Sequence, residues 1–168
     1  MKTIIHDLGG KLPDWLGKPD ADSVVIHADR RYAPCLGCFH CWLKNAGFCV
    51  MRDSLRHIGA LIGRSDPLIL VSRCVYGGYS GPVKAILDRA IGVSLPLFTW
   101  RGGQTQHISR YPRRRLMRVC FYGACTELER ETAREVVERN RLNLDYEKAD
   151  VVFSEHAEQL KEDSLCVF

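Results

Sequence analysis

Short apolar runs of strand length alternate along the chain with stretches whose apolar residues repeat at helical spacing. The runs "KTIIHDL", "SVVIHA", "PLILVS", "LMRVCFYG" and "ADVVFS" are rich in β-branched and aromatic residues, a composition that favours strands. Between the third and fourth runs, "PVKAILDRAI" places its apolar residues on one face of a helix. This alternation predicts an α/β protein with a parallel sheet.

Helix-start signals follow several of these runs. Thr126 and Glu129 form a T-x-x-E capping box, which predicts a helix towards Asn140. Asp53 or Ser54 is suited to cap an earlier helix. Five strands with intervening helices fit a flavodoxin-like, doubly wound sheet of strand order 2-1-3-4-5 in three layers. Ligands of such folds bind beyond the carboxyl ends of the strands, so we expect function in the loops that follow strands one, three and four.

The periodicity fails between residues 92 and 115, where Pro96, Gly102, Gly103 and Pro112 interrupt any regular element. We predict an irregular excursion there, within a single domain that spans residues 1–168. The apolar residues between positions 96 and 100 predict a subunit interface, and hence a homodimer or a higher homo-oligomer. The alternative is that they cover the protein's own pocket.

Composition narrows the class of protein. No apolar run approaches the roughly 20 residues of a membrane span, and His6 and Asp7 interrupt the start where a signal peptide needs an apolar stretch, so we expect a soluble cytoplasmic protein. The net charge is +4, and six arginines fall between residues 101 and 118. We interpret them as a solvated loop rather than a nucleic-acid surface, because no nucleic-acid-binding motif accompanies them.

Four of the eight cysteines lie in "CLGCFHCWLKNAGFC", with the spacing C-x2-C-x2-C-x7-C. In a reducing compartment such a cluster indicates metal or catalysis more often than disulfides. The spacing suits a four-iron four-sulfur cluster; the same four thiolates could also hold zinc, which we consider the less favoured metal, or pack as free thiols. The residues concerned are Cys35, Cys38, Cys41 and Cys49.

The segments "CLGCFHCW", "GFCVMRDS" and "SRCVYGGYSGPVKAILDR" occur in this order between about Pro34 and Leu144. Together they resemble the flavodoxin-fold family of NAD(P)H-dependent FMN reductases and iron-sulfur flavoproteins, in particular a subgroup that carries S-R-C-x-Y-G-G-Y-S and V-K-x-x-L-D-R. The resemblance implies a cluster on the four cysteines and FMN, whose ring contacts the loop after the third strand. The residues of that loop are Arg73, Cys74, Val75, Tyr76, Gly77, Gly78 and Tyr79.

The chemistry of this loop agrees with a flavin site. Adjacent glycines let the backbone approach a flat ring, and Tyr76 and Tyr79 offer rings for stacking. The alternative is a tight turn with packing tyrosines. On the helix that follows, Lys84, Asp88 and Arg89 are expected to form ion pairs or to contact a partner subunit.

The loop after the first strand departs from the family. Relatives that hold FMN tightly have a hydroxyl-rich phosphate loop there, whereas "GGKLPDWLGKPDAD" contains no Ser or Thr. Gly9, Gly10 and Lys11 still offer amides and one positive charge, so we expect weak phosphate binding or none. Tyr122 and Gly123, after the fourth strand, either complete one side of a flavin pocket or form a plain turn.

These observations favour an FMN-dependent oxidoreductase or electron-transfer flavoprotein that takes electrons from NAD(P)H and passes them to a small acceptor. No catalytic triad is needed, because the flavin supplies the redox chemistry. No catalytic residue is assigned, although His107 is of interest because Arg110 and Tyr111 are close in sequence. The alternatives are a non-enzymatic binding or structural subunit with a degenerate phosphate loop, and a zinc-stabilised interaction module.

Overall fold

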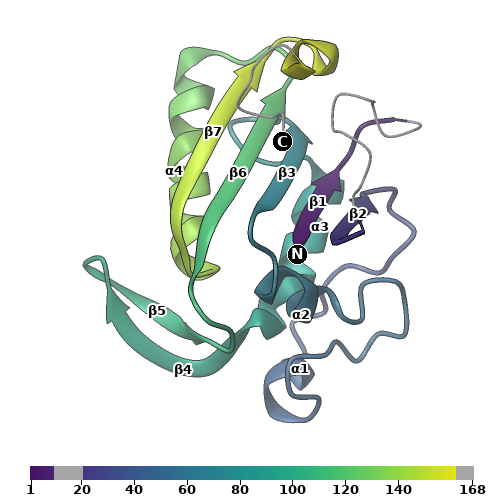
Figure 1. The fold of residues 1–168 in the computed structure, drawn as a ribbon, viewed down its shortest axis with the longest axis vertical. Helices are drawn as coiled ribbons and strands as arrows, with labels where there is room; N and C mark the ends of the chain where they lie inside the picture. The colour runs from purple at the N-terminus through teal and green to yellow at the C-terminus, as the bar shows by residue number, and fades with distance from the viewer. Residues whose placement is uncertain (10–20, 162–168) are drawn as a thin grey trace.

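The computed structural model describes residues 1–9 and 21–161. Five parallel strands form the main sheet in the order β2-β1-β3-β6-β7 (Figure 1). The predicted order 2-1-3-4-5 is therefore confirmed, with β6 and β7 as the fourth and fifth parallel strands. The strands are β1 (Lys2–His6), β2 (Ser23–His27), β3 (Leu68–Arg73), β6 (Arg114–Tyr122) and β7 (Tyr146–Ser154).

The two faces of the sheet are covered differently. On one face, α2 (Ile58–Gly63), α3 (Gly81–Arg89) and α4 (Glu127–Asn143) pack against the sheet in one hydrophobic cluster. On the other face, the described part of the chain contributes only the short η3 (Ala157–Lys161), whose Leu160 packs against apolar side chains of the strands. The third of the predicted layers is therefore reduced to η3 among these residues.

Local capping explains where the two long helices begin. The hydroxyl of Ser80 accepts a hydrogen bond from the amide of Val83 and starts α3. The capping box of Thr126 and Glu129 starts α4, as predicted. The earlier helix differs from expectation, because α2 has His57 at its N-cap rather than Asp53 or Ser54.

The segment at residues 92–115 leaves the main sheet, as predicted, but it is regular where we expected irregular structure. After η2 (Ala90–Val93), the strands β4 (Ser94–Arg101) and β5 (Gln104–Ser109) form an antiparallel hairpin that projects from the main sheet (Figure 1). Gly102 and Gly103 both have positive φ, the geometry of a two-residue hairpin turn. These glycines therefore connect two strands, and the register shift between Ser94 and Phe98 accommodates Pro96.

Among the residues that the structure describes, no helix is both long enough and apolar enough to cross a membrane.

Candidate functional site

The ends of three neighbouring strands meet at the carboxylate of Asp7, directly after β1. The amide of Arg73 at the end of β3 donates to both carboxylate oxygens, at 3.2 and 3.1 Å. The hydroxyl of Tyr122, at the end of β6, also hydrogen-bonds this carboxylate. Burial raises the pKa of Tyr122 to about 12, and the Asp7 carboxylate contributes to the shift. Asp7 thus holds together the carboxyl ends of β1, β3 and β6. We call this side of the sheet the carboxyl edge; it is where the fold class predicts ligand binding.

The loop after β3 is a tight turn. Val75 and Gly78 exchange two backbone hydrogen bonds of 3.0 and 2.9 Å, with Tyr76 and Gly77 between them. Both central residues have positive φ, 50° for Tyr76 and 74° for Gly77. A tyrosine in this region is strained by roughly 1 kcal/mol or more, and such strain is concentrated at functional sites. The ring of Tyr76 is 89% exposed at the tip of the turn.

Packing holds this turn against α4. A Cβ added at Gly77 would lie 2.7 Å from the Cβ of Thr132 and 2.8 Å from the carbonyl oxygen of Glu129. No side chain fits at this position without movement of the helix. A Cβ at Gly78 would meet only the carbonyl oxygen of Val75, at 3.6 Å. The first glycine is thus required by packing, while the second leaves open space for an approaching ring.

The structure divides the predicted flavin residues into exposed and buried sets. Tyr79 is buried against Phe121, with ring centroids 5.4 Å apart, so it is a core residue rather than a platform for stacking. Cys74 and Gly77 are also buried. At least partly accessible at the carboxyl edge are Gly9, Arg73, Val75, Tyr76, Gly78, Tyr122 and Gly123. Gly10 and Lys11 lie outside the described residues.

The accessible set offers a guanidinium, an aromatic ring and open backbone. The side chain of Arg73 lies over Gly123, whose added Cβ would be 3.5 Å from its Cγ. A Cβ at Gly9 would meet nothing within 4 Å. A flat heteroaromatic ring could therefore approach the backbone at this edge with Tyr76 beside it, so the residues fit the ring of FMN.

The four clustered cysteines line one small cavity at a different place in the fold. Cys35 and Cys38 are exposed, Cys41 lies in α1 (His40–Leu43), and Cys49 lies in the loop before α2. Burial raises the pKa of the Cys41 thiol, and the other three sulfurs are close enough to raise it further. The structure therefore brings together all four residues that the spacing selected.

A buried ion pair positions the segment that contains these cysteines, residues 33–53. Arg89, at the end of α3, makes two hydrogen bonds of 2.8 and 2.7 Å to Asp53 and one of 2.6 Å to the carbonyl of Ala33. Its guanidinium also contacts Cys49. The hydrogen bonds from Arg89 lower the pKa of Asp53 to about 2. Ion pairing along the face of α3 is thus confirmed for Lys84 with Asp88, whereas Arg89 pairs with Asp53 in the cysteine segment.

The two candidate metal groups differ in what they require of these thiols. Within residues 1–9 and 21–161, no group of three or more His, Cys, Asp or Glu side chains is close enough to hold a metal ion. A zinc tetrahedron needs four ligands around one ion, whereas a cubane binds each thiolate at a different corner. Both groups draw on the same four thiols, which line one small cavity.

Nine residues of α3 separate the cysteine cavity from the loop after β3. Arg89 at the end of the helix contacts the cysteine segment, and Ser80 at its start follows the Tyr76 turn. At about 1.5 Å per residue, the two places are roughly 13 Å apart along the helix. Figure 1 shows α1 at one end of the molecule and the carboxyl ends of β6 and β7 at the other.

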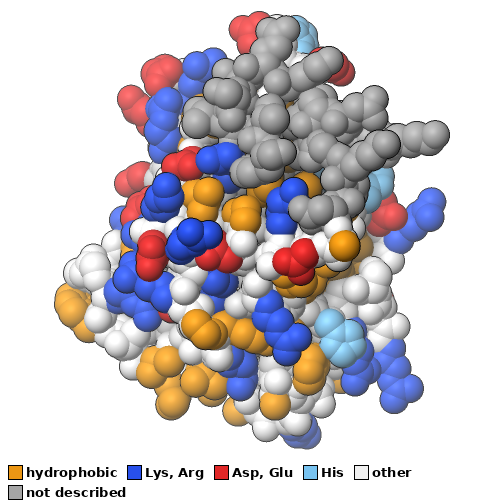
Figure 2. All heavy atoms as spheres, viewed as in Figure 1, with side chains coloured by type: hydrophobic (Ala, Val, Ile, Leu, Met, Phe, Trp, Pro, Cys, Tyr) orange, Lys and Arg blue, Asp and Glu red, His pale blue; other side chains and the backbone are white. Residues whose placement is uncertain are grey.

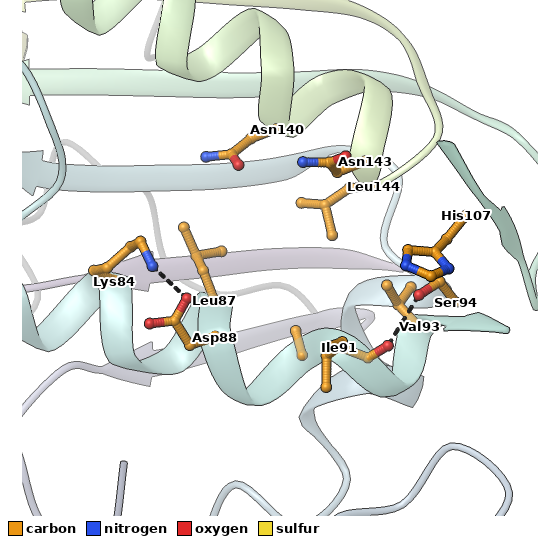
Figure 3. Close-up of a pocket in the computed structure, with 11 residues that line it drawn as sticks. Lys84, Leu87, Asp88, Ile91, Val93, Ser94, His107, Asn140, Asn143 and Leu144 are labelled. Carbon is orange, nitrogen blue, oxygen red and sulfur yellow. Dashed lines mark hydrogen bonds and ion pairs between the residues drawn. The ribbon is translucent and has the colours of Figure 1, made fainter. Parts of the chain in front are cut away.

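His107 lines a third hollow, of about 290 Å³, between α3, η2 and the end of α4 (Figure 3). Its ring lies 4.7 Å from Trp42 and 4.4 Å from Phe98 between centroids, and its Nδ1 is 3.0 Å from the carbonyl oxygen of Leu95. Among the other polar groups around this hollow, Lys84 pairs with Asp88 and Ser94 with the Ile91 carbonyl. His107 therefore connects the cysteine segment to the hairpin, away from the carboxyl edge.

Comparison with solved structures identifies the fold as flavodoxin-like. An NADH:FMN oxidoreductase in its apo form aligns with a TM-score of 0.53 and 11% identity over 97% of this chain and 80% of its own. An FMN-dependent NADH-azoreductase of Bacillus anthracis, in complex with FMN, gives 0.56 and 12% over 98% and 93%. An NADPH-quinone reductase of P. pentosaceus gives 0.52 and 10% over 99% and 96%. At these identities the likeness establishes the fold, in agreement with the resemblance seen in the sequence.

No family model matches the chain. An iron-sulfur flavoprotein of Methanocaldococcus jannaschii is 35% identical over 63 residues, which is 38% of this chain and 32% of that protein. The match thus spans about a third of the relative's length.

Sequence reasoning missed two residues that organise these sites. Asp7 was noted only as an interruption of an apolar start, although its position directly after a predicted strand placed it at the carboxyl edge. Asp53 was considered a helix cap, but it accepts hydrogen bonds from Arg89, Ala33 and Leu55. No local pattern pairs Asp53 with Arg89, which is distant in sequence.

Proposed function

We propose that this protein is an FMN-dependent oxidoreductase that accepts electrons from NAD(P)H and delivers them to a small acceptor. The observation that carries the proposal is the carboxyl edge, where an exposed Tyr76 on a strained turn stands beside open glycine backbone and the Arg73 side chain. The structural neighbours support the proposal, since they are described as an NADH:FMN oxidoreductase, an FMN-dependent NADH-azoreductase and an NADPH-quinone reductase.

In this proposal the protein residues bind and orient the cofactor. Tyr76 stacks on the ring, Gly78 and Gly123 allow it to approach the backbone, and Arg73 contributes positive charge. Asp7 keeps the three strand ends in register through its hydrogen bonds to Arg73 and Tyr122. The flavin, when bound, supplies the hydride and electron chemistry.

Titration of apo-protein with FMN and with riboflavin tests this function. We expect both to bind with similar affinity, because the loop after β1 lacks the hydroxyls of a phosphate cradle. Tyr76→Ala should weaken both, while Leu43→Ala, at an exposed position on α1, should weaken neither. A chain that binds no flavin and oxidises no NAD(P)H would refute the proposal and favour the non-enzymatic subunit.

We further propose that Cys35, Cys38, Cys41 and Cys49 hold a four-iron four-sulfur cluster, so that the protein transfers electrons between two centres. The shared cavity and the C-x2-C-x2-C-x7-C spacing support the cluster. The partial likeness to an iron-sulfur flavoprotein agrees with it.

Metal analysis of protein purified without oxygen tests the cluster. We expect iron and sulfide in near-equal amounts, lost in a Cys38→Ser, Cys41→Ser variant and retained in Cys125→Ser. Zinc in place of iron would support the interaction-module alternative. Folded wild-type protein without metal would leave the four cysteines as packing thiols.

We also propose that the hairpin mediates homo-oligomer formation. Leu97, Phe98 and Trp100 are each more than half exposed, and Figure 2 shows apolar side chains along the part of the surface where the hairpin and the cysteine segment lie. Light scattering should report a dimer or larger assembly, and Phe98→Asp with Trp100→Asp should dissociate it. Leu128→Asp, an equally exposed change on α4, should have no effect. A monomeric wild-type protein at micromolar concentration would refute this interface.

A further inference from the structure

Two cysteines outside the four-cysteine segment lie side by side at the carboxyl edge. The amide of Cys74, which follows β3, donates to the carbonyl of Tyr122 at 2.8 Å, so the pairing of β3 with β6 continues to this residue. Cys125 comes three residues after Tyr122, just before the cap of α4. Both side chains pack against the same hydrophobic cluster, and their thiols hydrogen-bond each other.

The surroundings of the two sulfurs differ. Cys74 is 7% exposed beneath the Tyr76 turn, and burial raises its pKa to about 11. Cys125 is only partly buried, and the guanidinium of Arg130 lies beside its sulfur. The Arg130 guanidinium donates a hydrogen bond to this sulfur. Cys125 is therefore the accessible member of the pair and Cys74 the member behind it.

We propose that Cys74 and Cys125 form a redox-active dithiol that reacts with low-molecular-weight disulfides and closes to a disulfide between the loop after β3 and the start of α4. Both sulfurs are present as free thiols in contact, so closure needs only a small side-chain rearrangement. The site requires neither flavin nor a metal cluster, and its test is independent of the proposed function.

The reaction proceeds in two exchanges. The Cys125 sulfur, having lost its proton, attacks one sulfur of the small disulfide; the S–S bond breaks, a thiolate leaves and takes up a proton. The Cys74 sulfur then loses its proton and attacks Cys125 in the mixed disulfide, which releases the second small thiol. Two protein thiols are oxidised by two electrons, and one small disulfide is reduced to two thiols.

Peptide mapping of reduced protein treated with hydroxyethyl disulfide tests this proposal. We expect a disulfide-linked product between the segment that begins at Cys74 and the segment that contains Cys125. Cys74→Ser should stop at a mixed disulfide on Cys125, and Cys125→Ser should leave Cys74 unmodified. The Cys38→Ser, Cys41→Ser variant is the control, because these free thiols line the other cavity and their replacement should leave the link intact.

The pH dependence of closure identifies the attacking thiol. After excess reagent is removed, loss of the Cys125 adduct should accelerate about tenfold per pH unit and continue to rise above pH 9, because Cys74 must be deprotonated with its raised pKa. Levelling off near the ordinary thiol value of about 8.5 would overturn the assignment of Cys74. Oxidation confined to the four-cysteine segment, or a link lost in the Cys38→Ser, Cys41→Ser variant, would overturn the proposal itself.

Discussion

The two candidate sites at opposite ends of α3 are built in different ways. The carboxyl edge is formed by consecutive strand ends whose register fixes Arg73 beside Tyr122, with the Asp7 carboxylate bridging them. The cysteine segment has little regular structure beyond α1 and depends on Arg89 for its position. One site follows from sheet topology, whereas the other depends on long-range contacts of individual side chains, chiefly the ion pair of Arg89 with Asp53 and the contacts of Trp42 with Ile91 and His107.

This difference has a consequence for how each site fails. Hydrogen bonds and packing from several elements support the Tyr76 turn, so a change at its tip should affect binding more than folding. The ends of the cysteine segment share one buried guanidinium, so its removal should affect the whole segment. The expected losses of stability are largest where a single buried side chain holds a segment in place.

Arg89→Met should lower the free energy of unfolding by about 3 kcal/mol, the lower part of the range for removing one partner of a buried pair, because Asp53 remains partly hydrated. Denaturant unfolding measures the loss. Lys84→Met, which breaks the exposed pair with Asp88 on the same helix, should cost well under 1 kcal/mol. Equal losses of stability in the two variants would show that the buried Arg89–Asp53 pair stabilises the protein no more than an exposed pair does.

Gly77→Ala should destabilise the protein by about 2 kcal/mol, because the new methyl group overlaps Thr132 and the φ of 74° disfavours a side chain. Gly78→Ala should change stability by less than about 0.5 kcal/mol, since its site is open. Thermal and denaturant unfolding measure the stability of both variants, and the difference shows how tightly each of the two glycines is packed. A tolerated Gly77→Ala would show that the loop does not press against α4.

Acid should weaken the cysteine segment through Asp53. Its folded pKa of about 2 lies below the ordinary value of 3.8, so the associated stability is present above pH 4 and is lost as the pH falls towards 2. We expect a loss of about 1.5 kcal/mol over this interval, after allowance for partial exposure of the carboxylate. Asp53→Asn should lack this part of the pH dependence. Unfolding curves that stay parallel for the two proteins between pH 4 and 2 would contradict the assignment.

Tyr76→Gly should stabilise the fold by about 1 kcal/mol, because glycine adopts the φ of 50° without strain. The same change should weaken FMN binding about tenfold through loss of stacking, equivalent to about 1.4 kcal/mol. Unfolding and fluorescence titration measure the two effects on one variant. A variant that loses both stability and binding would identify Tyr76 as a structural residue.

Much of the fold could be predicted because its signals are local. Buried parallel strands are continuous apolar runs, and the caps at Ser80 and Thr126 depend on residues three positions away. The hairpin was missed because Gly102 and Gly103 were interpreted as breakers, although two glycines between strands also favour a tight turn. The residues around Pro96 also lack the alternation of apolar and polar positions that would have predicted a strand.

By itself, the sequence determined the five parallel strands, the cysteine spacing and the glycine turn after β3, because each depends on residues that are close in the chain. The strand order followed from the fold class that the alternation of strands and helices indicates. Tertiary structure alone decided that Tyr76 is exposed and Tyr79 buried, since the turn geometry and the position of α4 select between two adjacent tyrosines. It alone paired Arg89 with Asp53 and Cys74 with Cys125. Those contacts join residues far apart in sequence, and only the packing of helices on the sheet brings them within bonding distance.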